Sequence, residues 1–189
     1  MTIRVHAAAD LPPALVRSVL AEADALWRAS GFRFEWRIVL DGPVPDDIES
    51  VVTPLPTPRV VIGDERGMDV GPDERPLGWV VFDSGSIPEQ RIHVSRANAL
   101  WLLDRSRGVV GPLDKMPPLQ RQLLARAMGR ALAHELSHYL LASKQHTGNG
   151  LMRARQSAAS LFGTHRVGYE ITAAQRGLAA RRLGGDSRR

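Results

Sequence analysis

The residues best suited to chemistry in this chain are two histidines and a glutamate within five consecutive positions. His134, Glu135 and His138 form the pattern H-E-x-x-H inside a stretch with helical periodicity. Residues four apart lie one turn from each other on the same face of an α-helix, so both imidazoles can bind one Zn²⁺ at about 2.0–2.1 Å. Glu135 is the only acidic residue between Lys115 and Tyr169. We expect it to act as the general base toward a water molecule on the metal.

A catalytic zinc ion normally has three protein ligands and one position open to water. The chain contains no cysteine, so the third ligand must be a histidine or a carboxylate. Downstream of the motif the candidates are His146, His165 and Glu170. Asn149-Gly150 favours a tight turn, and a chain that reverses there brings His146 back beneath the end of the helix. We therefore favour His146, with Glu170 and His165 as the alternatives.

The segment that runs from the H-E-x-x-H pattern through His146 to Gly150-Leu151-Met152-Arg153 resembles the metzincin clan of zinc metallopeptidases. It looks most like small bacterial members in which a longer spacer precedes the third histidine. The usual pattern is H-E-x-x-H-x-x-G-x-x-H, and here Leu141 occupies the glycine position and Lys144 the position of the third ligand. The resemblance implies that the ligand has moved to His146 and that Met152 supports the metal from a turn beneath it.

The resemblance also implies the activity, which is that of a zinc metalloendopeptidase with Zn²⁺ as cofactor and a peptide or protein as substrate. Residues 161–169 are expected to form the pocket wall on the leaving-group side. His165 and Tyr169 are candidate donors there, because a tetrahedral intermediate needs a polar group to stabilise it. The strand expected at 77–82, or the one after it, would pair with an extended substrate backbone.

The segments that must position these residues alternate between strands and helices. Strands are predicted at 2–6, 32–38, 60–62, 77–82 and 91–94, and helices at 12–30, 95–104, 119–143 and 171–183. Asp10 or a neighbouring residue is expected near the cap of the first helix, and Gly31 is expected to end it. Gly129 interrupts the helix at 119–143, at a cost of about 1 kcal/mol relative to alanine.

This order predicts an α+β fold, with a mixed and mostly parallel twisted sheet of about five strands on two long helices plus a C-terminal helix. Residues 41–58, with five prolines, and 64–76 are expected to be surface loops. The whole chain, 1–189, reads as one metzincin-like catalytic domain. Its parts are the sheet with the first helix (1–114), the active-site helix with the methionine turn (115–152), and a C-terminal subdomain (153–189).

Charge is distributed unevenly along the 189 residues. Residues 1–114 have 17 acids and 12 bases, whereas 115–189 have 3 acids and 13 bases. The bases are 23 arginines and 2 lysines, an imbalance typical of a high-GC coding bias, so we expect a peptide substrate rather than a nucleic acid. The sequence contains no signal peptide and no apolar run of membrane-spanning length, which is compatible with a cytoplasmic protein or with an exported one whose signal has been removed.

Two other functions remain open. The first is a metal-binding module of the same fold without protease activity. The second is a metal-dependent hydrolase that acts on nucleic acid, motivated by the basic C-terminal part. Glu135 favours the peptidase, because a purely structural zinc site has no use for a general base and closes the fourth coordination position.

Overall fold

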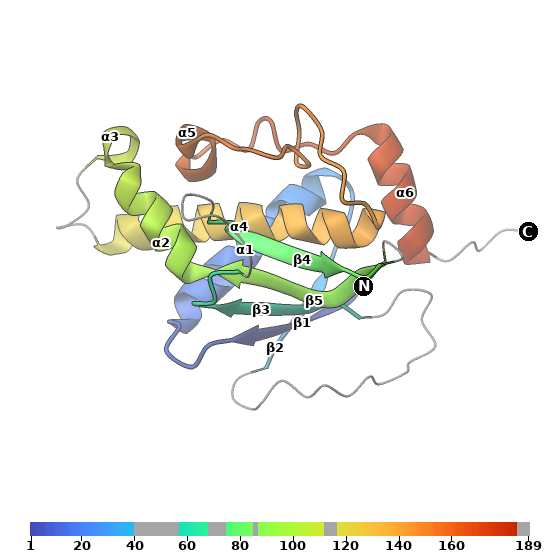
Figure 1. Ribbon diagram of the computed structural model, residues 1–189, viewed down its shortest axis with the longest axis horizontal. Helices are drawn as coiled ribbons and strands as arrows, with labels where there is room; N and C mark the ends of the chain where they lie inside the picture. Colours follow the sequence, from blue (N-terminus) through green and yellow to red (C-terminus); the bar gives the residue numbers. More distant parts are fainter. Residues whose placement is uncertain (40–56, 68–74, 85–86, 112–116, 185–189) are drawn as a thin grey trace, which may run out of the picture.

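The computed structural model describes residues 1–39, 57–67, 75–84, 87–111 and 117–184 (Figure 1). In chain order the elements are β1 (Thr2–Ala7), α1 (Pro13–Ala29), β2 (Glu35–Val39), β3 (Arg59–Gly63), β4 (Gly78–Phe82), β5 (Pro88–Ser95), α2 (Arg96–Arg105), α3 (Arg107–Val110), α4 (Pro117–Leu141), α5 (Ala158–Phe162) and α6 (Ala173–Gly184).

The strands form one five-stranded sheet in the order β2-β1-β3-β5-β4. Neighbouring strands are parallel except β4, which pairs antiparallel with β5. The β1-α1-β2 segment gives the parallel pair that its pattern predicts. The predicted fold class, a mixed and mostly parallel sheet with two long helices and a C-terminal helix, is confirmed. β4 has a neighbour on one side only among the described strands, so it forms an edge of this sheet.

Helices α1 and α4 lie on one face of the sheet (Figure 1). Alternate residues of the central strands point into the core beneath them and are at most 1% exposed; these are Ile3, Val5, Val60, Ile62, Ile92 and Val94. The opposite face is polar. There the strand register places Arg37, Arg4, Arg59 and Arg91 side by side across four adjacent strands. His6 lies on the same face. Its pKa is lowered by burial and by the positive charges of Arg59, Arg4 and Arg91.

Helix α4 is buried on nearly every side, since α1, the sheet, α5 and α6 all pack against it. The contact with α1 is close enough to require glycine at one position. A Cβ added at Gly129 would lie 2.6 Å from Glu22 Cβ and 2.7 Å from the carbonyl oxygen of Val19. Gly129 therefore lowers the helix propensity of α4 but permits the approach of the two helices, which the sequence pattern did not reveal.

Several predicted boundaries are corrected. Asp10 does not cap the first helix: α1 begins after Pro12 with no side-chain cap, and Asp10 lies 2.5 Å from an Arg96 nitrogen instead. The strand predicted at 32–38 begins later, at Glu35, because the chain first turns through Gly31 at φ +89°. Two short helices, α3 and α5, lie in segments where no helix was predicted. The predicted loops at 41–58 and 64–76 and the tail lie largely outside the described residues.

None of the helices in the described segments combines the length and the apolar character that crossing a membrane requires.

Substitution of Gly129 by alanine tests the helix contact. Alanine has the better helix propensity by about 1 kcal/mol, but overpacking a close contact costs about 1–3 kcal/mol. We expect Gly129→Ala to lower the free energy of unfolding by up to about 2 kcal/mol in urea denaturation. The matched control is Gly177→Ala in α6, where an added Cβ meets no atom closer than 3.5 Å and the stability should rise. Equal stabilisation by both substitutions would contradict the packing role of Gly129.

Candidate metal centre and cleft

Three histidines meet at the C-terminal end of α4. His134 Nε2 lies 3.0 Å from His138 Nε2, which lies 3.2 Å from His146 Nε2. Potential ligand atoms of all three lie within 4.8 Å of one another. Two nitrogens bound to one tetrahedral zinc ion at about 2.0–2.1 Å are about 3.3 Å apart, so the observed spacing matches a shared metal.

The other ring nitrogen of two of these histidines is held by a backbone carbonyl. His134 Nδ1 lies 2.7 Å from the carbonyl oxygen of Leu151, and His138 Nδ1 lies 2.5 Å from that of Ser143. A carbonyl only accepts, so each Nδ1 donates and each Nε2 of the neutral ring is left with a lone pair. Facing lone pairs cannot hydrogen-bond each other. The arrangement therefore fits a cation, and the all-nitrogen donor set fits Zn²⁺.

The local electrostatics favour the neutral form of the His134 and His138 rings. Burial, together with the charges of His138 and His146, lowers the pKa of His134 to about 4. Burial also lowers the pKa of His138. Neutral imidazole is the form that binds a metal, so at pH 7 these two ligands need not lose a proton first.

The end of α4 explains how His146 reaches the other two histidines. The Ser143 N–H donates to the His138 carbonyl and the Ala142 N–H to the Tyr139 carbonyl, both at 3.3 Å, which is the Schellman pattern of a helix C-terminus. Ala142 adopts the left-handed conformation, with φ +46°, that glycine usually supplies. The chain thus reverses one residue after Leu141, and the carbonyl of Ser143 is left beside the His138 ring.

A second turn, at residues 147–153, supports the site from below. The Thr147 N–H donates to the Met152 carbonyl at 2.9 Å, and the Leu151 N–H donates to the Glu170 carbonyl at 3.0 Å. Gly150, at φ +74°, has no room for a side chain, because a Cβ there would lie 2.5 Å from the same Glu170 oxygen. Met152 is 1% exposed. The turn thereby fixes the Leu151 carbonyl that orients His134.

The side chain of Glu135 extends from α4 toward strand β4. It is 8% exposed, and the backbone of Val80 hydrogen-bonds its carboxyl group. Burial raises the pKa of Glu135 to about 8. Gly78 leaves the space for this side chain, since a Cβ at that position would lie 2.8 Å from Glu135 Cγ. The glutamate therefore lies in a fixed position next to the histidine cluster, and its carboxylate takes up a proton more readily than that of an exposed glutamate.

The three histidines and Glu135 open onto a cleft of about 590 Å³ between β4 and the segment that follows α4. Tyr169 lines this cleft, and its hydroxyl lies 3.0 Å from Ser160 Oγ. His165 is exposed and is not among the lining residues. Glu170 does not belong to the cluster either. Its carboxylate accepts a hydrogen bond from the Gly168 N–H at 3.0 Å.

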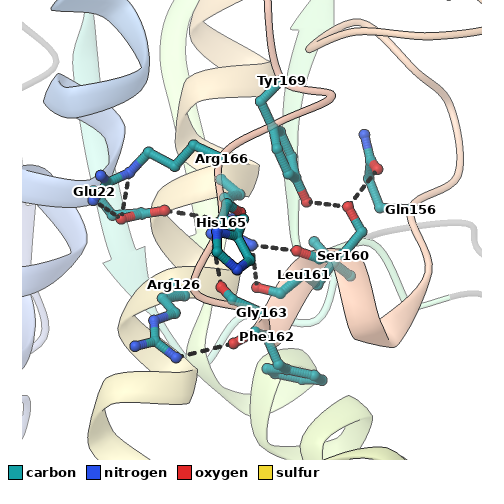
Figure 2. A network of polar contacts seen from close by, with 11 residues as sticks. Glu22, Arg126, Gln156, Ser160, Leu161, Phe162, Gly163, His165, Arg166 and Tyr169 are labelled. Atoms are coloured by element: carbon teal, nitrogen blue, oxygen red, sulfur yellow. Dashed lines mark hydrogen bonds and ion pairs between the residues drawn. The ribbon is translucent and has the colours of Figure 1, made fainter.

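The cleft wall is tied to α4 by a buried arginine. Arg130, one turn before His134 and 1% exposed, lies 2.9 Å from a carboxylate oxygen of Glu22. Its other nitrogens donate to four backbone carbonyls in the segment 160–165, which lines the cleft at Leu161. These are the carbonyls of Ser160, Leu161, Gly163 and His165. Figure 2 shows these carbonyls gathered near the Glu22 and Arg166 side chains, with Tyr169 beside Ser160. The guanidinium also lies 4.9 Å from the centre of the Tyr169 ring.

The structure thus brings His134, His138, His146 and Glu135 together, with Met152 buried in the adjoining turn. It does not bring His165 or Glu170 to the cluster. Sequence reasoning missed Gly78 and Arg130. An arginine four positions before the first histidine shares its helix face, a spacing that could have indicated Arg130, but no local pattern indicated Gly78.

Comparison with known proteins identifies similar folds only among solved structures. The chain matches no protein-family model and no curated protein. It is similar to a zinc-dependent peptidase from Methanocorpusculum labreanum, with a TM-score of 0.58 and 14% identity over 94% of this chain and 99% of that one. It is also similar to an archaemetzincin from Methanopyrus kandleri, with a TM-score of 0.52 and 14% identity over 97% and 96%. At this identity the likeness establishes a shared fold.

Zinc titration of alanine variants tests the ligand set. We expect His146→Ala to weaken zinc binding by more than about 100-fold, since loss of a mere supporting contact around a metal costs about 10–100-fold. His165→Ala and Glu170→Ala are the matched controls and should bind zinc as the wild type does. Loss of binding in Glu170→Ala with retention in His146→Ala would reverse the assignment.

Arg130→Met tests the attachment of the cleft wall. The variant keeps an unbranched side chain but leaves four carbonyls and part of the Glu22 carboxylate without their partner, which should lower the stability by about 3–5 kcal/mol. Limited proteolysis should cut within 160–166 sooner than in the wild type. Arg126→Met, which removes one bond of 3.1 Å to the Phe162 carbonyl, is the control and should have a much smaller effect.

Proposed function

We propose that the protein is a zinc-dependent peptidase of the metzincin type that hydrolyses peptide bonds within a chain. The observation that carries the proposal is the convergence of three imidazole Nε2 atoms beside a buried glutamate in an open cleft. Two solved structures of similar fold are described as a zinc-dependent peptidase and an archaemetzincin, which supports the same activity.

His134, His138 and His146 would hold the metal, and Met152 would support it from the turn beneath. A bound Zn²⁺ supplies a Lewis acid that polarises the scissile carbonyl and makes water acidic enough to react at neutral pH. The ring orientations set by the Leu151 and Ser143 carbonyls hold the lone pairs toward the metal before it binds. Such preorganisation reduces the free energy of reorganisation on binding.

Glu135 would act as the general base and then as the general acid. Its carboxylate accepts a proton from the attacking water and returns it to the amide nitrogen that leaves. The hydrogen bond from the backbone of Val80 and the tight space beside Gly78 fix the orientation of the carboxylate. The low-dielectric surroundings that raise its pKa to about 8 make it a stronger base than an exposed glutamate.

The substrate would lie extended along β4. As an edge strand, β4 has backbone groups on one side that no described strand pairs with, and an extended peptide can pair with them. Tyr169 is the better placed of the two proposed donors for the tetrahedral intermediate, because it lines the cleft and His165 does not. The segments 1–114, 115–152 and 153–189 would act as one catalytic domain, since Gly78, His134 and Tyr169 line the same cleft.

Glu135→Gln tests this function. The variant is nearly isosteric and keeps the histidines, so we expect unchanged zinc content but a fall in kcat of about 10²–10⁴-fold on an unfolded, quenched casein substrate. Removal of zinc with 1,10-phenanthroline should abolish the wild-type activity, and added Zn²⁺ should restore it.

Two outcomes would favour the other functions. A wild type that binds zinc tightly yet cleaves no unfolded protein would indicate a metal-binding module. Cleavage of an RNA substrate that depends on both zinc and Glu135 would indicate a hydrolase of nucleic acid.

A further inference from the structure

Among the residues that the structure describes, four cationic side chains and one carboxylate line the cleft. The cations are Arg75, Arg130, Lys144 and Arg153, and the carboxylate is Glu135. Arg130 is buried and directed at backbone carbonyls, so the charges available to a ligand are those of Arg75, Lys144 and Arg153. A bound metal ion would add further positive charge. The walls therefore offer a strongly positive potential to whatever enters.

Two of these cations are held in place by aromatic rings rather than by acids. Lys144 Nζ lies 5.3 Å from the centre of the Phe82 ring, and Phe82 packs edge-on against His138 at 6.4 Å. The Arg75 guanidinium lies 4.6 Å from the centre of the Trp101 ring. Within the part of the chain that the structure describes, neither cation has a carboxylate partner. Their charges are thus positioned but not neutralised by these contacts.

The two cations lie toward opposite ends of β4. Glu135 meets this strand between Gly78 and Val80. Lys144 packs on Phe82, two residues beyond Val80, and Arg75 comes three residues before Gly78. Trp79 lies between these two contacts. At about 3.3 Å per residue of extended chain, Phe82, on which Lys144 packs, lies about 10 Å along β4 from Trp79. Arg75 precedes the first residue of β4 and so lies on the opposite side. An extended peptide covers about 10 Å with about three residues.

We propose that the cleft selects peptides that carry acidic side chains on both sides of the bond to be cleaved, about three residues away. The proposal rests on the peptidase function above. Arg75 pairs with an acidic residue on one side and Lys144 with one on the other. Arg153, exposed and next to Met152, adds to the potential that attracts such a substrate.

The lining between the cations favours a peptide over a nucleic acid. It contains apolar side chains, among them Leu77, Val80, Leu102 and Leu161, and the backbone edge of β4. A single-stranded nucleic acid needs positive charge all along its backbone and free aromatic faces for its bases. The Trp79 ring is already stacked on His93 at 4.8 Å.

Three quenched decapeptides test the selectivity. They share an apolar centre and differ only at the third residue on each side of the central bond, which is Glu, Gln or Lys. An exposed ion pair is worth about 1.4- to 5-fold, and the Glu and Lys peptides differ by two attractions and two repulsions. We expect the zinc-loaded wild type to show kcat/KM about 10-fold or more higher for the Glu peptide than for the Lys peptide at low salt. The ratio should approach one in 1 M NaCl.

Charge-reversal variants connect the preference to the two residues. The double variant Arg75→Glu, Lys144→Glu should prefer the Lys peptide, and the milder Arg75→Gln, Lys144→Gln should have no preference. Arg17→Glu, Arg181→Glu changes the net charge by the same amount on α1 and α6, away from the cleft, and should keep the wild-type ratio. A wild-type ratio in the double Gln variant would overturn the proposal.

A binding measurement separates this proposal from the peptidase function. Zinc-loaded Glu135→Gln should bind the labelled Glu peptide more tightly than the Lys peptide by fluorescence anisotropy. Cleavage of all three peptides at equal rates overturns the charge selectivity and leaves the peptidase function standing. Selective binding with no cleavage by the wild type supports the selectivity and overturns the function. Tighter binding of a 20-nucleotide single-stranded DNA, weakened by the double Glu variant, overturns the choice of a peptide.

Discussion

The Nε2 lone pairs of His134 and His138 face each other at the end of α4, and the rest of the structure must hold them in place. Their separation of 3.0 Å is too short for two groups that only accept hydrogen bonds, unless a cation lies between them. His146 Nε2 lies beside them, 3.2 Å from His138 Nε2. The orienting groups are backbone carbonyls from two turns, those of Leu151 and Ser143. A carbonyl fixed by its own turn cannot reorient in response to the ring, so the site is rigid where a metal needs rigidity.

The burial of α4 also keeps the histidine cluster in place. A helix packed on nearly every side cannot rotate or slide, and so its polar residues stay at fixed positions. Two residues that fit poorly into an ordinary amphipathic helix make this burial feasible. Gly129 lets α1 approach, and Arg130 joins α4 to both Glu22 and the carbonyls of the cleft wall. The helix that carries the histidines is therefore also the element that positions the opposite side of the cleft.

The strand that borders the site has an equally specific role. β4 is short and lies at the edge of the sheet, and it pairs antiparallel where its neighbours are parallel. Its first residue, Gly78, leaves room for Glu135, and its last, Phe82, packs against both His138 and Lys144. This strand of five residues therefore contacts the carboxyl group of Glu135, the ring of His138 and the ammonium group of Lys144. β4 therefore positions both the proposed catalytic glutamate and one of the charges that would select a substrate.

The sequence by itself was enough to predict that His134, Glu135 and His138 lie together on one helix, and in which order the strands and helices follow. Both depend on periodicities of a few residues. The sequence also favoured His146 through a turn signal, and the structure places that residue with the other two. Gly129, Gly78 and Arg130 were misjudged or missed, since their roles depend on atoms 30 or more residues away in the chain. The reversal at Ala142, in a conformation that alanine disfavours, was likewise decided by tertiary packing. Local patterns specify which side chains a helix presents, whereas close approach and charge pairing arise only when distant segments share the same space.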